Sequence, residues 1–95
     1  MSVDKDEDAR AAIAELRRLI ALKMDNIDAP ELLALVDRAT GHVANPDNHK
    51  RLSDALAGAL TVVRFGEMFG TDPAPAIAQA TKLLEGLEQL SRMPD

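Results

Sequence analysis

The sequence predicts an all-α protein, a compact bundle of four helices that assembles as a homodimer. Apolar residues recur at steps of three and four along most of the chain, which is the period of an amphipathic helix. Asn, Asp, Pro and Gly separate these stretches where helices usually begin and end. No stretch alternates polar and apolar residues as a strand would. With 95 residues, the chain is expected to form one helical domain, 1–95, with residues 1–3 and 93–95 frayed.

The first helix is expected over about residues 5–24. Asp4 and Glu7 have the spacing of a capping box, in which each side chain satisfies an otherwise free amide. Apolar residues then recur on one face at Ala9, Ile13, Leu16, Ile20 and Met24. Residues 26–28 are expected to end this helix.

The second helix is expected over about residues 29–43. Asp28 and Glu31 form another capping box, and Pro30 lies in the first turn, where its missing N–H has no partner to lose. The helix is expected to fray near Gly41. Its apolar face is predicted to consist of Leu32, Leu35, Val36, Ala39 and Val43.

The third and fourth helices are expected over about residues 46–69 and 73–92. Asn45 followed by Pro46 is typical of a helix start, and Gly70 suits a left-handed helix end. The chain restarts at 71–73. The fourth helix is predicted to place Ile77, Ala80, Leu84 and Leu87 on one face.

The third predicted helix is apolar around most of its circumference, because residues 55–63 carry no charge. Such a helix must be covered on most sides. Either the other three helices wrap it, or one face lies against a second copy or another protein. We expect the second arrangement, because three short helices hardly suffice to enclose a fourth. The predicted interface residues are Leu56, Leu60, Val63, Arg64, Phe65 and Phe69.

The charge balance argues against two classes of partner. The formal net charge is −5, whereas a nucleic-acid-binding surface needs an excess of Lys and Arg. The same balance disfavours an anionic membrane surface, and the uncharged stretch 55–63 is far shorter than the ~20 residues that cross a bilayer. We therefore expect a cytoplasmic protein that binds itself or another protein, with no nucleic acid and no membrane.

Residues that could carry chemistry are few. The chain has no Cys, and the seven-residue spacing of His42 and His49, with Asp47 between them, matches no metal-ligand signature. No nucleophile–base pair or glycine-rich phosphate loop is visible. We therefore expect no catalytic residue, no metal and no cofactor, and we expect the two histidines to be exposed in a turn.

These observations predict a non-enzymatic helical interaction module, such as an adaptor, an inhibitor or an assembly subunit. It would bind proteins by burying apolar side chains of the third helix. The alternative is a small helical enzyme or ligand-binding protein, with a polar pocket near Arg64, His49 and Lys50. Arg64 has two interpretations: it pairs locally with Glu67 or extends to water, or it anchors a partner across an interface.

Overall fold

The computed structural model describes residues 5–24 and 27–92, and these residues confirm the predicted all-α fold class. They form the α-helices α1 (Lys5–Ala21), α2 (Ala29–Thr40), α3 (Pro46–Phe65) and α4 (Ala74–Arg92), with a short 3-10 helix, η1 (Gly66–Phe69), after α3. None of the described residues forms a strand. The predicted cap at Asp4 and the predicted frayed ends fall outside the described residues.

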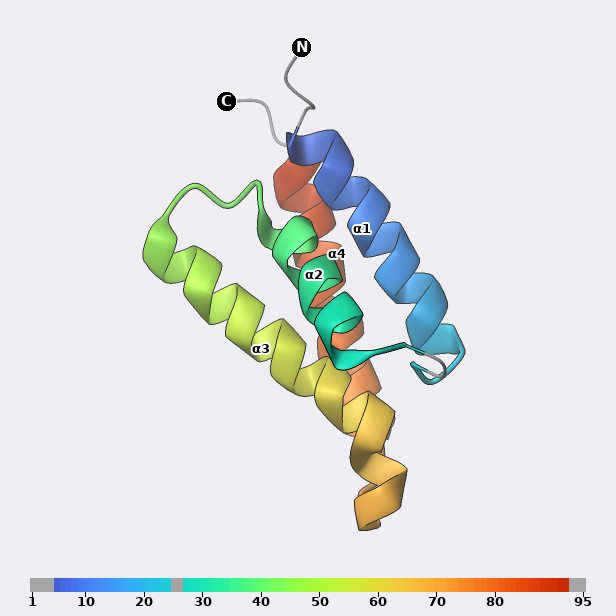
Figure 1. Ribbon diagram of the computed structural model, residues 1–95. Helices are drawn as coiled ribbons and strands as arrows, with labels where there is room; N and C mark the ends of the chain where they lie inside the picture. The colour runs from blue at the N-terminus through green and yellow to red at the C-terminus, as the bar shows by residue number, and fades with distance from the viewer. Residues whose placement is uncertain (1–4, 25–26, 93–95) are drawn as a thin grey trace.

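The four helices form a closed ring of neighbours. α1 packs against α2, α2 against α3, α3 against α4, and α4 against α1. Each helix runs antiparallel to the one before it (Figure 1). The end of α3, η1 and the start of α4 extend beyond α1 and α2 as a hairpin, at the bottom of Figure 1. The molecule is therefore elongated, with dimensions of 44 × 23 × 19 Å.

α1 ends at Ala21, three residues before its predicted end. The Met24 amide donates to the Leu19 carbonyl at 2.8 Å and the Lys23 amide to the Ile20 carbonyl at 2.9 Å, which is the bond pattern of a Schellman turn. Lys23 and Met24 both have a φ of 57°, a left-handed conformation that strains side chains other than glycine. The same turn buries the Met24 side chain in the core, which offsets the strain.

α2 begins after Asp28, as predicted, and ends at Thr40, three residues before its predicted end. Asp28 has the extended backbone of a helix cap, but its side chain makes no capping hydrogen bond, so the predicted side-chain bond of the capping box with Glu31 is wrong. The Val43 amide donates to the Thr40 carbonyl at 3.0 Å, three residues back instead of four. This tighter turn ends the helix near Gly41.

α3 begins after Asn45, as predicted. The Asn45 side-chain oxygen accepts hydrogen bonds from the amides of Asp47 at 3.0 Å and Asn48 at 3.1 Å, which satisfies two amides of the first turn. α3 ends at Phe65, and the remainder of the predicted helix forms η1. Gly70 then adopts a φ of +72°, the left-handed conformation predicted for it.

α4 begins at Ala74, one residue after its predicted start. Asp72 caps it, because its carboxylate accepts a hydrogen bond from the Ala74 amide at 3.0 Å. The Thr71 amide donates to the Gly66 carbonyl at 2.8 Å, which holds the connection against the end of α3. α4 runs to Arg92, as predicted.

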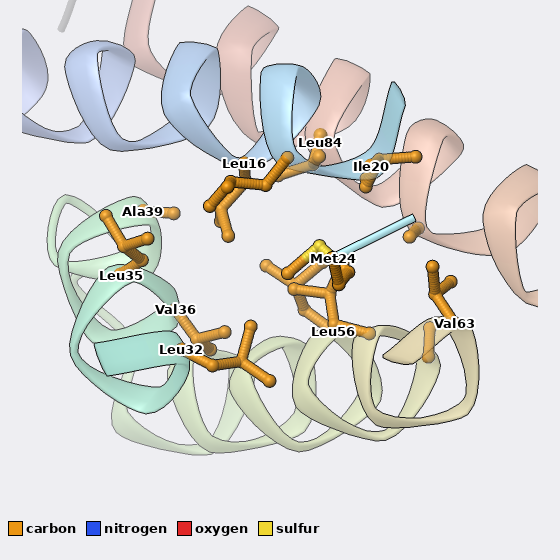
Figure 2. Close-up of a cluster of buried hydrophobic side chains, with 14 of the residues drawn as sticks. Leu16, Ile20, Met24, Leu32, Leu35, Val36, Ala39, Leu56, Val63 and Leu84 are labelled. Carbon is orange, nitrogen blue, oxygen red and sulfur yellow. The ribbon is translucent and has the colours of Figure 1, made fainter. Parts of the chain in front are cut away.

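Each helix contributes one apolar face to the core. In Figure 2, Leu16, Val36 and Leu56, from three different helices, belong to one cluster of buried side chains. No aromatic side chain of the described residues lies in this cluster. The predicted Val43 and Ile77 are only partly buried against it. The other predicted positions of α1, the turn after it, α2 and α4 are confirmed as buried: Ala9, Ile13, Leu16, Ile20, Met24, Leu32, Leu35, Val36, Ala39, Ala80, Leu84 and Leu87.

α3 is one side of the ring and not its centre. Its main neighbours are α2 and α4, so the alternative in which the other three helices wrap it is excluded. The side of α3 that faces the core consists of Leu56, Ala59, Leu60 and Val63. The side that faces solvent includes Asp54, Gly58 and Thr61.

An exposed ion pair joins α1 to α2. The Arg38 guanidinium donates to the Asp8 carboxylate from Nη2 at 2.8 Å and from Nε at 3.1 Å. The hydrogen bond, assisted by the positive charge of Arg38, lowers the pKa of Asp8 below its usual value. Because the folded pKa is the lower one, the pair stabilises the fold above the pKa of the unfolded chain. This contribution is lost as the pH falls through the folded pKa.

We expect Arg38→Gln to return the pKa of Asp8 to its usual range. NMR titration of the side-chain carboxyl carbons measures this directly. Glu15 is the internal control, because its pKa is lowered by a hydrogen bond from Arg18, which the substitution leaves in place. A pKa of Asp8 that does not rise in the variant would contradict the pairing.

Polar contacts also join the first and last helices. Arg10 Nη1 donates to the Ser91 carbonyl at 3.1 Å, near the start of α1 and the end of α4. Farther along, Arg17 Nη2 lies 3.3 Å from a carboxylate oxygen of Glu88. The start of α1 and the end of α4 therefore lie side by side.

Candidate functional site

The six predicted interface residues fall into two groups. Leu56 and Leu60 have no exposed surface, and Val63 is 3 % exposed, all within a single chain. They contact the buried side chains of the other helices and are not accessible to a partner in this fold. We therefore correct the prediction for these three positions and assign them to the core.

The second group lies at the projecting end of the molecule. Phe65 is partly buried, and Phe69 is 79 % exposed. Met68, which the sequence reasoning missed, is 78 % exposed, and Val62, one turn before Phe65, is also exposed. We call Val62, Phe65, Met68 and Phe69 the tip patch. It contains both aromatic side chains of the chain.

The 3-10 helix η1 determines how the tip patch is presented. Gly66 is buried, and a Cβ built on it would lie 3.2 Å from the Thr71 carbonyl oxygen, so the chain turns tightly there. A tighter helix places Met68 and Phe69 at angles that differ from a continued α-helix. The core-facing row of α3 continues from Val63 to Gly66, so Met68 and Phe69 do not belong to it, and both remain in solvent.

Arg64 lies beside the tip patch. Its guanidinium carbon is 4.6 Å from the centre of the Phe65 ring, a cation–π contact. Arg64 makes no ion pair within the described residues, and the side chain of Glu67, its predicted partner, is outside them. A positive charge that is held over an aromatic ring is thus available beside an apolar surface.

A buried hydroxyl joins α2 to α3. Thr40 has no exposed surface, and its Oγ1 lies 3.0 Å from the Val36 carbonyl, 2.9 Å from Ser53 Oγ and 3.2 Å from His49 Nε2. Because a carbonyl can only accept, Thr40 donates to it, and its oxygen accepts from Ser53 and His49. His49 is therefore a structural residue of this contact, contrary to the prediction that it is exposed.

The structure does not bring together the polar residues of the alternative hypothesis. Arg64 lies about 21 Å along α3 from Lys50, at a rise of about 1.5 Å per residue. None of Arg64, His49 and Lys50 lines the cavities of about 350, 320 and 260 Å³. We therefore do not propose the polar pocket.

Two cavities lie at the end of the molecule away from the tip. The first is lined by the α2–α3 connection, α3 and Leu90 of α4, and it includes the polar residues His42, Asn45 and Asn48. The second lies between α3 and α4 and is lined mainly by leucines, with Gln89 and Lys82. The two cavities have volumes of about 350 and 320 Å³, and they are neighbours, because Leu52 and Leu90 line both of them. Leu87, which lines the second, is buried, and Leu90 is 46 % exposed. We call the two cavities together the α3–α4 groove and define it by Val43, Leu52, Leu83, Gly86, Leu87 and Leu90.

Two cations line the same groove, Arg51 from α3 and Lys82 from α4. No carboxylate of the described side chains lines either cavity. At one end, His42 Nε2 donates to the Leu87 carbonyl at 3.0 Å, which fixes the α2–α3 connection against α4. The groove thus combines an apolar surface with uncharged polar side chains, Asn45, Asn48 and Gln89, and two cations.

The histidines are used in helix contacts. His42 bonds to α4 and His49 to α2, so they diverge from each other. The described residues contain no group of three His, Cys, Asp or Glu side chains placed to hold a metal ion. In the same part of the chain, no helix combines the length and the apolar character needed to span a bilayer.

Comparisons with known proteins give no relative from which a function could be transferred. No protein-family model matches the chain, and neither a curated protein nor a solved structure gives a match to it. Its function is therefore inferred from the geometry and chemistry of its surfaces.

Proposed function

We propose that this protein is a non-enzymatic helical interaction module that self-associates through the tip patch. The observation that carries the proposal is the exposure of Met68 and Phe69, at 78 % and 79 %, beside Val62 and Phe65. Aromatic side chains and Met are enriched in protein interfaces, because they remove much apolar surface from water. An adaptor or assembly subunit would use such a surface to hold two chains together.

The tip patch differs from the remaining exposed apolar side chains. Leu90 belongs to the α3–α4 groove, whereas Leu22, in the turn after α1, and Leu33, on α2, stand apart from each other in the sequence. Single exposed leucines are normal on a protein surface. A contiguous apolar patch instead marks a site of interaction, and the four residues of the tip patch lie within two turns of one segment.

Charge complementarity favours a second copy as the occupant. Among the described side chains of the tip are a cation, Arg64, and a carboxylate, Asp72, and neither makes an ion pair within the described residues. A twofold interface is formed by the same surface on both copies. A twofold contact that placed Arg64 of each copy against Asp72 of the other would form two equivalent ion pairs.

The distribution of charge over the whole chain also permits this contact. The net charge of −5 would repel two copies that met through their acidic surfaces. The acidic first turn of α1 lies at the opposite end of a 44 Å molecule from the tip (Figure 1). Because charges are screened beyond about 8 Å at physiological ionic strength, contact through the tips keeps the acidic first turns of α1 in the two copies from repelling each other.

Sedimentation equilibrium tests the proposal. We expect the mass to rise from one chain, 10.2 kDa, toward two chains between about 1 μM and 1 mM, because four side chains make an interface at the small end of specific complexes. Phe69→Asp is expected to keep the mass at one chain throughout. Arg64→Glu is expected to weaken the dimer less, since the apolar contacts remain.

Leu33→Asp is the matched control, because Leu33 is an exposed leucine on α2, outside the tip patch. It introduces the same charge and should leave dimerisation unchanged. A wild-type mass of one chain at every concentration refutes the proposal. Equal loss of the dimer in Leu33→Asp and Phe69→Asp would also refute the assignment to the tip.

A further inference from the structure

We propose that the α3–α4 groove binds an acidic amphipathic helix of a partner protein. The groove lies at the end of the molecule away from the tip patch, so this binding does not depend on self-association. Three properties of the groove identify the occupant: its apolar floor, the absence of a side chain at Gly86, and the sign of the charges on its rim.

The apolar surface of the groove suits a helix. Leu83, Leu87 and Leu90 follow α4 at steps of four and three, so the apolar row is about 10 Å long at a rise of about 1.5 Å per residue. This length corresponds to roughly two helical turns. Both cavities are open to solvent, whereas small-molecule pockets enclose most of their ligand. A helix that places its apolar residues between α3 and α4 would cover the surface that is left open.

Gly86 allows such a helix to approach closely. It lies inside α4 and lines the groove, and a Cβ built on it would meet no atom within 4 Å. No contact with the described residues therefore requires glycine at this position, although glycine weakens a helix interior. A partner helix that packs over Gly86 would occupy the space that a side chain at position 86 would otherwise fill.

The rim of the groove selects an acidic partner. Most described arginines already contact an acceptor of the chain: Arg17, Arg18, Arg38 and Arg92 bind carboxylates, and Arg10 binds a carbonyl. Arg51 and Lys82 make no ion pair in the described part of the chain. Arg51 lines the first cavity from α3 and Lys82 lines the second from α4, and no carboxylate of the described side chains lines either. Glutamates that flank an apolar row on the incoming helix would pair with both cations.

Two labelled peptides test this inference by fluorescence anisotropy. Each has about 18 residues, enough to form a helix on binding, with leucines at i, i+3, i+4 and i+7. The first carries glutamate at the flanking positions and the second carries lysine there. We expect the glutamate peptide to bind at least about tenfold more tightly at low salt, and we expect this difference to shrink as salt is added. Equal binding of the two peptides, or no binding up to about 1 mM, overturns the proposal.

Matched variants locate the binding site. Arg51→Glu is expected to weaken the glutamate peptide about fivefold or more, whereas Lys50→Glu, the same change at a neighbour that does not line the groove, leaves it unchanged. Gly86→Leu fills the groove and is expected to abolish binding. Gly58→Leu is its control, because Gly58 is another glycine inside a helix with open space around it. Equal effects within either pair would contradict the assignment.

The same titration separates this proposal from self-association. Phe69→Asp removes the apolar tip but leaves the groove intact, so we expect it to bind the glutamate peptide as the unmodified chain does. Loss of binding in this variant would place the peptide on the tip patch and overturn the assignment to the groove. Retained binding together with a single-chain mass would support the groove even if self-association failed.

Discussion

Leu60→Ala is expected to lower the free energy of unfolding by about 3–4 kcal/mol, because Leu60 is fully buried. The loss combines the transfer of apolar surface with the cavity that the shorter side chain leaves between α3 and its neighbours. A domain of this size unfolds at a cost of roughly 5–10 kcal/mol, so the variant would keep about half of its stability. Urea unfolding followed by circular dichroism at 222 nm measures the change.

Leu33→Ala is the control for this measurement, because Leu33 is 56 % exposed on α2. It is expected to change the free energy of unfolding by less than about 0.5 kcal/mol. A similarly small change in Leu60→Ala would show that Leu60 is not part of the core. If Leu60→Ala dissociated a dimer without loss of stability, the interface expected from the sequence would be correct after all.

Thr40→Val is expected to lower the free energy of unfolding by about 2 kcal/mol, although the two side chains have nearly the same shape. The substitution removes the oxygen that accepts from Ser53 and His49 and the hydroxyl that bonds to the Val36 carbonyl. Ser53 and His49 are half-buried, so water replaces these bonds only in part. The same unfolding experiment measures the cost.

Thr61→Val provides a matched comparison, because Thr61 also donates to the carbonyl four residues earlier, that of Ala57, at 2.7 Å. Thr61 is exposed on the solvent side of α3, so water can satisfy the Ala57 carbonyl after the substitution. Its expected effect is below about 0.5 kcal/mol. Equal effects at the two positions would mean that the contact between α2 and α3 contributes nothing beyond the local bond.

The faces of the helices could be predicted from the sequence because each apolar row has helical spacing. Ile13, Leu16 and Ile20 are an example, and all three are buried. The ends of the helices were harder to predict. The turn that ends α1 contains two residues with left-handed backbones, Lys23 and Met24. Because neither is a glycine, the residue types in the sequence do not indicate this turn. The burial of the Met24 side chain stabilises this turn through contacts with other helices, and local helix propensity does not include such contacts.

The interface prediction misassigned Leu60 because it took the apolar surface of this helix to be wider than one core-facing side. Leu56, Leu60 and Val63 follow steps of four and three, which is the ordinary width of a buried helix face. The neutral residues on the other side, such as Gly58 and Thr61, lack charge but are too small or too polar to need cover. The absence of charge was therefore a weaker signal of an interface than the cluster of large apolar residues at the end of the helix.

The tip patch could be predicted from the sequence in part, whereas the α3–α4 groove could not. Phe65 and Phe69 stand out as the two aromatic residues, and Met68 could have been included as a large apolar residue next to Phe69. The α3–α4 groove could not be predicted, because Leu52 and Leu90 lie 38 positions apart in the sequence and meet only through the packing of two helices. A depression between helices depends on how far they separate, and periodicity does not encode that separation.

The hydrogen bond from Arg10 to the Ser91 carbonyl joins the two ends of the bundle, so the order of the helices along the chain can be changed by protein engineering. Since the start of α1 and the end of α4 are adjacent, a short flexible linker can join them without distorting either helix. The chain can then be reopened at an exposed connection, such as residues 41–45, to give a circular permutant with the same helix contacts. For the same reason, the whole bundle can be grafted into a surface loop of a host protein through two neighbouring attachment points.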